Sequence, residues 1–245
     1  MKLANLTAIV DYMRKRYSLQ RLGITIATIL CLHPIAAPAL DQPSSDLVDG
    51  AAELQKLLTQ VNGWSDYTCL TEQHNFKPNK ITIAASKFFY KKGPVVRIEV
   101  VGGGFRDGSV VVRSRDGKIT GKGGGLMGCI QMTLDPDSRM LILPSGINVM
   151  HADFPELVAK LNNDLAHGFS SKMSSSPVTE PDLGRKVFGI EIHDNSNALK
   201  AKLFLSAEDH LPLRWDIFRA DGGKTQTYFK NLRFNTGLSD DLFNM

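Results

Sequence analysis

Three titratable residues, Glu208, Asp209 and His210, follow one another in the last fifth of this sequence. Two carboxylates and an imidazole can exchange protons with a substrate or bind a metal ion. The triplet lies between two apolar-alternating runs, in a predicted hairpin turn where polar residues are expected for structural reasons alone. We therefore favour a structural turn over a catalytic or metal site at this position.

Other residue types that serve catalysis or cofactor binding do not form motifs in this sequence. The histidines after residue 40 stand apart and outside any H-E-x-x-H pattern: His74, His151, His167, His193 and His210. No G-x-S-x-G nucleophile motif is present. The glycine clusters at 102–104 and 123–125 lack the spacing of a phosphate-binding loop, and Gly223-Lys224-Thr225 lies in a predicted hairpin turn. We predict no catalytic residue, no metal and no cofactor, and a protein that is not an enzyme.

The first 39 residues have the pattern of a secretory signal peptide. An apolar core over 22–32 follows a basic region, and Ala37-Pro38-Ala39 has the small residues of a cleavage site. The core is short for a transmembrane helix, although a retained anchor stays an alternative. We predict cleavage after Ala39 and a single domain over residues 40–245 in the periplasm.

Removing this segment also removes the positive charge of the chain. The whole chain has 29 Lys and Arg against 25 Asp and Glu, and residues 1–39 contain five of the basic residues and one of the acidic ones. The mature chain would therefore be formally neutral. Nucleic-acid binding usually needs a basic surface, so we exclude a nucleic-acid partner.

Cys69 and Cys129 remain after cleavage of the signal peptide. In an oxidising compartment an isolated pair of cysteines is a candidate disulfide. Closing a loop of this length would stabilise the fold by about 4 kcal/mol in the chain-entropy model. Two buried free thiols are the alternative, because spacing alone does not bring the two Cα atoms into bonding range.

Apolar periodicity predicts two helices and many strands. Helical spacing covers 46–61, with Ser44 or Ser45 as a cap, and 153–165, with Asp153 as a cap. Period-two alternation predicts strands over 67–75, 81–91, 95–101, 110–115, 118–122, 130–134 and 139–143. Residues 168–184 are rich in Ser and Pro and are predicted to form a loop. This order indicates the α+β class, with one large antiparallel sheet and helices on one face.

The stretch from Val187 to Phe234 reads as an antiparallel meander with one apolar face, and turn residues separate its runs. Two helices are few to cover about nine strands, so the apolar faces either form a fully packed core or line a cavity for an apolar ligand. The residues that we predict to bind lipid there are Val96, Ile98, Val100, Val110, Val112, Ile130, Met132, Ile190, Ile192, Leu203, Leu205, Trp215, Ile217 and Phe229.

The same stretch resembles the closing hairpins of the LolA-like superfamily, periplasmic lipoprotein carrier and sorting proteins and their MucB/RseB relatives. The resemblance rests on Leu203–Ser206, on the L-P-L-R-W motif within His210–Trp215, and on Tyr228–Asn235 with Leu238 and Phe243 after it. It implies an unclosed half-barrel with helices on its concave face and a hydrophobic cavity that holds acyl chains. The glycine-rich segment 121–129 and the segment 168–184 have no match in LolA, so the resemblance favours another branch.

These features predict a monomeric, non-enzymatic binding or carrier protein for outer-membrane lipoprotein sorting. Its partners would be a lipid or the acyl chain of a lipoprotein, and a membrane complex of the cell envelope. One alternative is a MucB/RseB-like module that senses envelope stress and binds a protein partner. Another is a periplasmic hydrolase that uses Glu208, Asp209 or His210.

Overall fold

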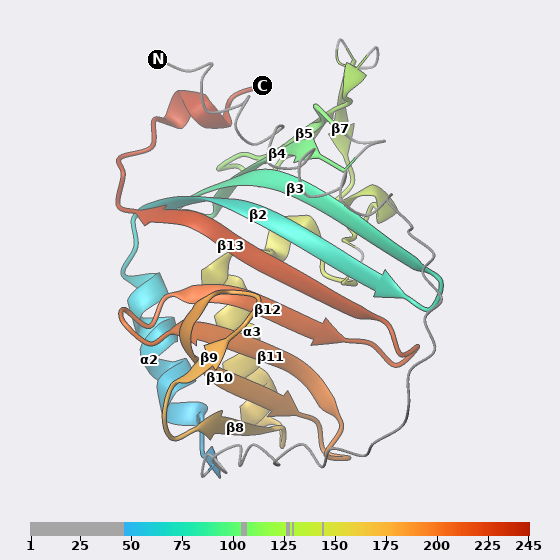
Figure 1. Cartoon of the computed structure of the whole chain (residues 1–245). Helices are drawn as coiled ribbons and strands as arrows, with labels where there is room; N and C mark the ends of the chain where they lie inside the picture. The colour runs from blue at the N-terminus through green and yellow to red at the C-terminus, as the bar shows by residue number, and fades with distance from the viewer. Residues whose placement is uncertain (1–46, 104–106, 126–127, 129, 144) are drawn as a thin grey trace, which may run out of the picture. The chain divides into compact units, whose positions relative to one another are not determined.

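A curled antiparallel sheet dominates the computed structural model, which describes residues 47–245 except 104–106, 126–127, 129 and 144 (Figure 1). Within these residues the sheet has thirteen strands, all paired antiparallel, and it does not close into a barrel. The predicted α+β class and open sheet are confirmed. The predicted signal peptide over residues 1–39 lies outside the described residues and stays a prediction.

The two edges of the sheet are formed by a strand near the start of the described chain and a strand from its middle. In spatial order the strands are β1 (Leu47–Val48), β8 (Ser170–Ser174), β10 (Arg185–His193), β11 (Leu199–Ser206), β12 (Pro212–Phe218), β13 (Lys224–Phe234), β2 (Asp66–Lys77), β3 (Lys80–Lys91), β4 (Val95–Gly102), β5 (Val110–Arg113), β6 (Ile119–Lys122) and β7 (Gln131–Leu134). The short β9 (Val178–Glu180) pairs with the first residues of β10. The last long strand, β13, therefore lies in the middle of the sheet beside β2.

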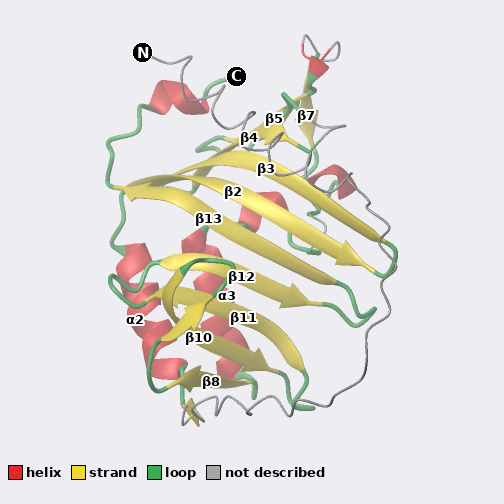
Figure 2. Ribbon diagram, viewed as in Figure 1, coloured by secondary structure: helices red, strands yellow, loops and turns green. Residues whose placement is uncertain are grey.

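Two helices, α2 (Ala51–Asn62) and α3 (Phe154–Ala166), lie together on one face of the sheet, behind it in Figure 2. Each buries an apolar stripe at helical spacing, formed by Leu54, Leu57 and Val61 in α2 and by Phe154, Leu157, Val158 and Leu161 in α3. At 12 and 13 residues both fall short of a membrane span, and no other helix in the described part of the chain has the length and hydropathy for one.

The predicted boundaries of the second helix are confirmed, because a local cap defines them. Asp153 Oδ1 accepts a hydrogen bond of 3.0 Å from the backbone N–H of Glu156, and Pro155 occupies the first turn, where its missing N–H costs nothing. The first helix begins later than predicted, because Leu47–Val48 pairs with β8. Gly50 precedes that helix, and a Cβ there would lie 2.9 Å from Ile190 Cγ2, so only glycine allows this close approach.

Two other predicted segments are wrong. Residues 168–184 form β8 and β9 instead of a loop, because backbone pairing with β10 satisfies a strand whose side chains are mostly polar. Residues 139–143 do not form a strand. Arg139–Leu141 is a 3₁₀ turn, and Ser138 Oγ accepts a hydrogen bond of 3.3 Å from the Met140 N–H at its start. A second 3₁₀ turn, Val149–His151, leads into α3.

The main core lies between the concave face of the sheet and the two helices. Tyr67 is buried there between the rings of Phe88 and Tyr90, with centroid distances of 5.8 and 5.1 Å. Its hydroxyl accepts a hydrogen bond of 3.0 Å from the Phe154 N–H, which fixes the start of α3 over the sheet. A smaller cluster on the outer face joins Val95 and Val112 to Phe243 in the C-terminal 3₁₀ turn Asp240–Phe243.

Candidate functional site

A hollow lies between the concave face of strands β3 to β7 and a segment that precedes α3. We call residues 139–143 and 145–151 the cover. The cavity has a volume of about 590 Å³, within the range typical of small-molecule sites. Its floor includes Ile98, Val100, Val111, Met132 and Leu134 from the sheet, and Met140, Leu141, Ile142, Leu143 and Val149 of the cover close it.

Buried side chains hold the cover in place. Leu141 and Met150 are almost completely inaccessible to solvent and belong to the main core. The Leu143 N–H donates a hydrogen bond of 2.8 Å to the Ile147 carbonyl, and Asn148 Nδ2 donates one of 2.7 Å to the Pro136 carbonyl. The cover is therefore a folded element with its own anchors.

The rim of this cavity is apolar and exposed. We call Ile130, Met132, Met140 and Ile142 the lip; their exposed fractions are 46%, 41%, 58% and 40%. Four large apolar side chains gathered at one opening are unusual on a soluble surface, where such residues are normally scattered. The lip indicates that an apolar molecule or surface meets the protein here.

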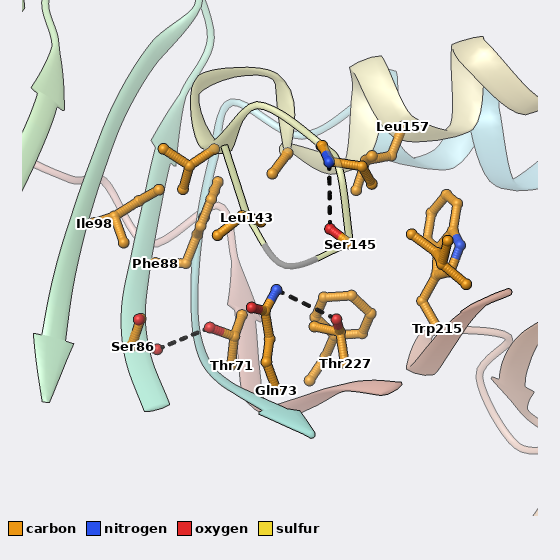
Figure 3. A pocket seen from close by; sticks show the side chains of 15 residues that line it. Thr71, Gln73, Ser86, Phe88, Ile98, Leu143, Ser145, Leu157, Trp215 and Thr227 are labelled. Carbon is orange, nitrogen blue, oxygen red and sulfur yellow. Dashed lines mark hydrogen bonds between the residues drawn. The ribbon is translucent and has the colours of Figure 1, made fainter. Parts of the chain in front are cut away.

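A smaller cavity of about 70 Å³ lies between the sheet and α3, and its lining includes Trp215 of β12 and Leu157 of α3 (Figure 3). Ser86, Ile98, Leu143 and Val149 line both cavities, so the two are neighbours. The smaller cavity combines apolar side chains such as Trp215 and Leu157 with neutral polar ones. These polar side chains are Thr71, Gln73, Ser86, Ser145 and Thr227.

Charge is nearly absent from both cavities. Of the described residues that line them, Lys122 at the larger cavity is the one charged side chain. An ion inside would lose its hydration without a counter-charge, which is strongly unfavourable. The interior therefore suits an apolar chain and a neutral polar group.

The structure brings seven of the predicted lipid-binding residues to the cavities. Ile98, Val100, Ile130 and Met132 line the larger one, and Ile98, Trp215, Ile217 and Phe229 line the smaller one.

The other predicted residues are elsewhere. Five are packed in the main core and line neither of the two cavities: Val96, Ile190, Ile192, Leu203 and Leu205. Val110 and Val112 belong to the cluster on the outer face, and the assumed phase of this strand is wrong. Val111, between them, lines the larger cavity. Three consecutive valines carry no alternation from which the inward face can be chosen.

Sequence reasoning missed two groups of lining residues. Met140 to Leu143 belong to the apolar run 139–143, which the alternation predicts as a strand, and the structure places them in the cover instead. Thr71, Gln73 and Ser86 have the polar character of a solvent-facing strand position, so no signal in the sequence placed them on the concave face. Thr71 pairs with Ser86 and Gln73 pairs with Thr227, so each pair shares one face of the sheet, and all four residues line the smaller cavity.

Cys69 is buried on β2 and forms no disulfide with any other described residue. Burial raises the pKa of its thiol to about 12, which leaves it unreactive at neutral pH. Cys129 lies outside the described residues, so the disulfide between the two cysteines stays a prediction.

The Glu208-Asp209-His210 triplet forms a turn whose polar groups bond locally. Ser206 Oγ accepts hydrogen bonds from the N–H groups of Glu208 and Asp209, and Asp209 Oδ1 accepts one of 3.2 Å from the Leu211 N–H. His210 Nδ1 lies 2.5 Å from Glu53 Oε1 and joins the turn to α2. Among the described residues no group of three or more His, Cys, Asp or Glu side chains is placed to hold a metal ion.

No protein-family model and no curated protein matches this sequence. Solved structures with a similar arrangement include a LolA superfamily protein from Nitrosomonas europaea, at 11% identity over 81% of this chain and 98% of that chain, with a TM-score of 0.47. The Mycobacterium tuberculosis lipoprotein LppX has 11% identity over 78% and 97%, with a TM-score of 0.46. MucB of Pseudomonas aeruginosa, solved with MucA, has 14% identity over 80% and 60%, with a TM-score of 0.44. The first of these structures is described as a member of the LolA superfamily, which the C-terminal hairpins resemble.

Proposed function

We propose that this protein is a non-enzymatic carrier of the periplasm, which binds the acyl chains of a lipid or lipoprotein in the larger cavity. The observation that carries this proposal is a cavity of about 590 Å³ with an almost wholly apolar lining and an exposed apolar lip. Each methylene group that moves from water into such a site gains about 0.8 kcal/mol. Burial of an alkyl chain is therefore enough to drive binding.

The same geometry supports release as well as capture. The lip leaves the cavity open at one side, so an acyl chain can enter without unfolding of the sheet. The cover is a short segment held by a few anchors, in contrast to the long pairings within the sheet. A carrier needs such a site, since a fully enclosed chain would leave only slowly.

Native mass spectrometry of the mature protein purified from its own cell envelope, followed by organic extraction, tests the proposal. We expect a co-purifying lipid that is lost after extraction. A clean apo mass together with no binding of a fluorescent fatty acid would overturn the carrier function. Co-purification of a protein in place of lipid would instead favour a regulatory module, of the kind represented by the complex of MucB with MucA.

Two neighbouring residues of β4 provide a matched pair of variants. Val100 lines the larger cavity, and Val101 is exposed and absent from its lining. Val100→Arg places a charge in the apolar site and should weaken binding of the fatty acid by roughly tenfold or more. Val101→Arg should leave binding within about twofold. Equal effects of the two variants would show that the fatty acid binds elsewhere.

A further inference from the structure

A strip of neutral polar side chains crosses the concave face of the sheet. Thr227 on β13 pairs with Trp215 on β12 at one side and with Gln73 on β2 at the other. Thr71 lies two residues before Gln73 on β2, on the same face, and it pairs with Ser86 on β3. Side chains directly opposite each other in a sheet have Cβ atoms about 5 Å apart, so these residues form one continuous surface. All of them line the smaller cavity (Figure 3).

The hydrogen-bonding capacity of this strip is only partly used. Gln73 Nε2 donates to Thr227 Oγ1 at 3.5 Å, which is the weak end of the range. Thr71 Oγ1 donates to the Ser86 carbonyl at 3.2 Å. Trp215 is only 5% exposed, and its indole N–H finds no acceptor among the described residues. Trp215 lines the smaller cavity, and buried donors are normally paired, so this unpaired N–H is a candidate donor to a bound acceptor.

Charge and size narrow the choice of that acceptor. The one charged side chain in either lining, Lys122 on β6, is four strands away from Gln73 in the described sheet. A carboxylate or phosphate near Gln73 would therefore have no counter-charge. The smaller cavity, at about 70 Å³, is also only a fraction of the roughly 590 Å³ of the larger one. A small neutral polar group such as an ester or amide suits this lining, and a charged phosphate headgroup does not.

We propose that the smaller cavity is a hydrogen-bonding subsite for the neutral ester or amide linkage of an acylated ligand whose apolar chain occupies the larger cavity. Trp215 Nε1–H donates to the carbonyl oxygen of the linkage, and the Gln73–Thr227 pair supplies further hydrogen bonds. Ile98 and Leu143 line both cavities and lie where the linkage joins the chain. This subsite rests on the proposed carrier function and adds selection for neutral acyl derivatives over free fatty acids.

Three probes of equal chain length separate the linkage from the chain. Methyl oleate has a neutral ester, oleate has a carboxylate, and 1-octadecene has no polar group. Their affinities for the mature protein are measured by displacement of a fluorescent acyl probe. We expect methyl oleate to bind more tightly than 1-octadecene and than oleate, each by about three- to tenfold, the range of one hydrogen bond.

Substitutions that remove only a hydrogen-bonding group test the residues themselves. Trp215→Phe and Thr227→Val should each weaken the binding of methyl oleate by about three- to tenfold. The affinity for 1-octadecene should change by less than about twofold. Phe229→Leu, at a neighbouring apolar position of the same cavity, should affect both probes alike. A second readout comes from Trp64→Phe, which leaves Trp215 as the single tryptophan. Methyl oleate should then shift the fluorescence emission of Trp215, and 1-octadecene should shift it less.

The possible results separate the subsite from the carrier function. If no probe binds to the unsubstituted protein, the carrier function itself fails. If 1-octadecene binds as tightly as methyl oleate, the carrier function survives and the subsite is overturned. If Trp215→Phe and Thr227→Val each lose the same affinity for methyl oleate and for 1-octadecene, the subsite is also overturned, because the two side chains would then contribute only packing.

Discussion

Glu72 on β2 is the centre of a small charge network in which a single proton affects stability. Its Oε1 lies 2.6 Å from His74 Nε2, and its Oε2 accepts a hydrogen bond of 2.6 Å from Lys230 Nζ on β13. The hydrogen bond from His74 and the neighbouring Lys230 lower the pKa of Glu72 from 4.5 to about 2. The ionised form is therefore favoured by folding, and the network ties β2 to β13.

Glu72→Gln should remove a pH-dependent part of the stability. Because the folded state has the lower pKa, the stabilisation by Glu72 is complete above pH 4.5 and is lost as the pH falls to about 2. At pH 7 we expect the variant to be less stable by up to about 3 kcal/mol, and the difference should vanish near pH 2. Urea unfolding at several pH values measures it, with Asp137→Asn, at an exposed turn position, as the control. A difference that does not change with pH would contradict the assignment.

Asp153 caps α3, and its carboxylate is buried beside Arg113, with 3.4 Å between Oδ2 and Nη2. Asp153→Ala should destabilise the fold by about 1 kcal/mol or more, since the N–H groups of the first turn lose their acceptor. Asp153→Asn retains a side-chain oxygen as an acceptor and should lose less stability than Asp153→Ala. Urea unfolding of the two variants at pH 7 compares them, and equal losses would show that the charge rather than the cap matters.

Burial raises the pKa of Asp153 to about 6, so this group affects stability in the direction opposite to Glu72. The folded state binds its proton more tightly than the unfolded chain, whose pKa is near 3.8. The cost of the charged form is therefore present above pH 6 and disappears as the pH falls to about 4. In Asp153→Asn this dependence should be absent from unfolding curves measured between pH 4 and 7.

At the scale of elements, the cover decides how closed the larger cavity is. It lies between β7 and α3. Adjacent residues of the cover differ sharply in burial, since Leu141 is in the core and Met140 is at the lip. The cover thus has an anchor and a contact surface at adjacent positions. Stability and ligand binding can therefore be changed separately within this one segment.

Leu141→Ala should destabilise the protein by about 2–5 kcal/mol, the usual result of truncating a buried leucine. Met140→Ala removes exposed surface and should change stability by less than about 0.5 kcal/mol. The same Met140 variant should weaken acyl-chain binding, because it shortens the lip. Urea unfolding and fatty-acid displacement provide the two measurements. Loss of stability in Met140→Ala, or none in Leu141→Ala, would reverse the roles assigned to these neighbours.

Elements with local signals could be predicted from the sequence, and elements defined by distant pairing could not. The cap at Asp153 defines α3, and the alternation in the C-terminal meander defines β10 to β13. β8 was missed because its strand character comes from pairing with β10, which no local pattern reveals. The cavity was predicted as a general property of an uncovered apolar face. The polar strip in the cavity could not be predicted, because Gln73 and Thr71 are residue types that also occur on solvent-facing strand positions. Only the pairing of the strands shows which face they are on.

At the scale of the whole molecule, ligand binding and stability should be linked. A ligand that binds only the folded state at 100 times its Kd stabilises that state by about 2.7 kcal/mol. Saturating fatty acid should therefore raise Tm by several degrees in the unsubstituted protein and in Val101→Arg. The rise in Tm of Val100→Arg should be smaller, about half as large if its affinity is tenfold weaker, as measured by differential scanning calorimetry. A shift of equal size in all three proteins would place the bound chain outside the larger cavity.

The central position of β13 has a consequence for the time course of folding. β13 pairs with β2, and 154 residues separate Gln73 from Thr227, which lie opposite each other. The meander β2 to β7 and the meander β10 to β12 can each form from neighbouring segments, but nothing joins β2 to β12 until residues 224–234 have been synthesised. Proteins dominated by such distant contacts fold in milliseconds to seconds rather than microseconds. Until β13 has paired with both neighbours, β2 and β12 each have an unpaired edge, which is the kind of edge that can pair with another chain.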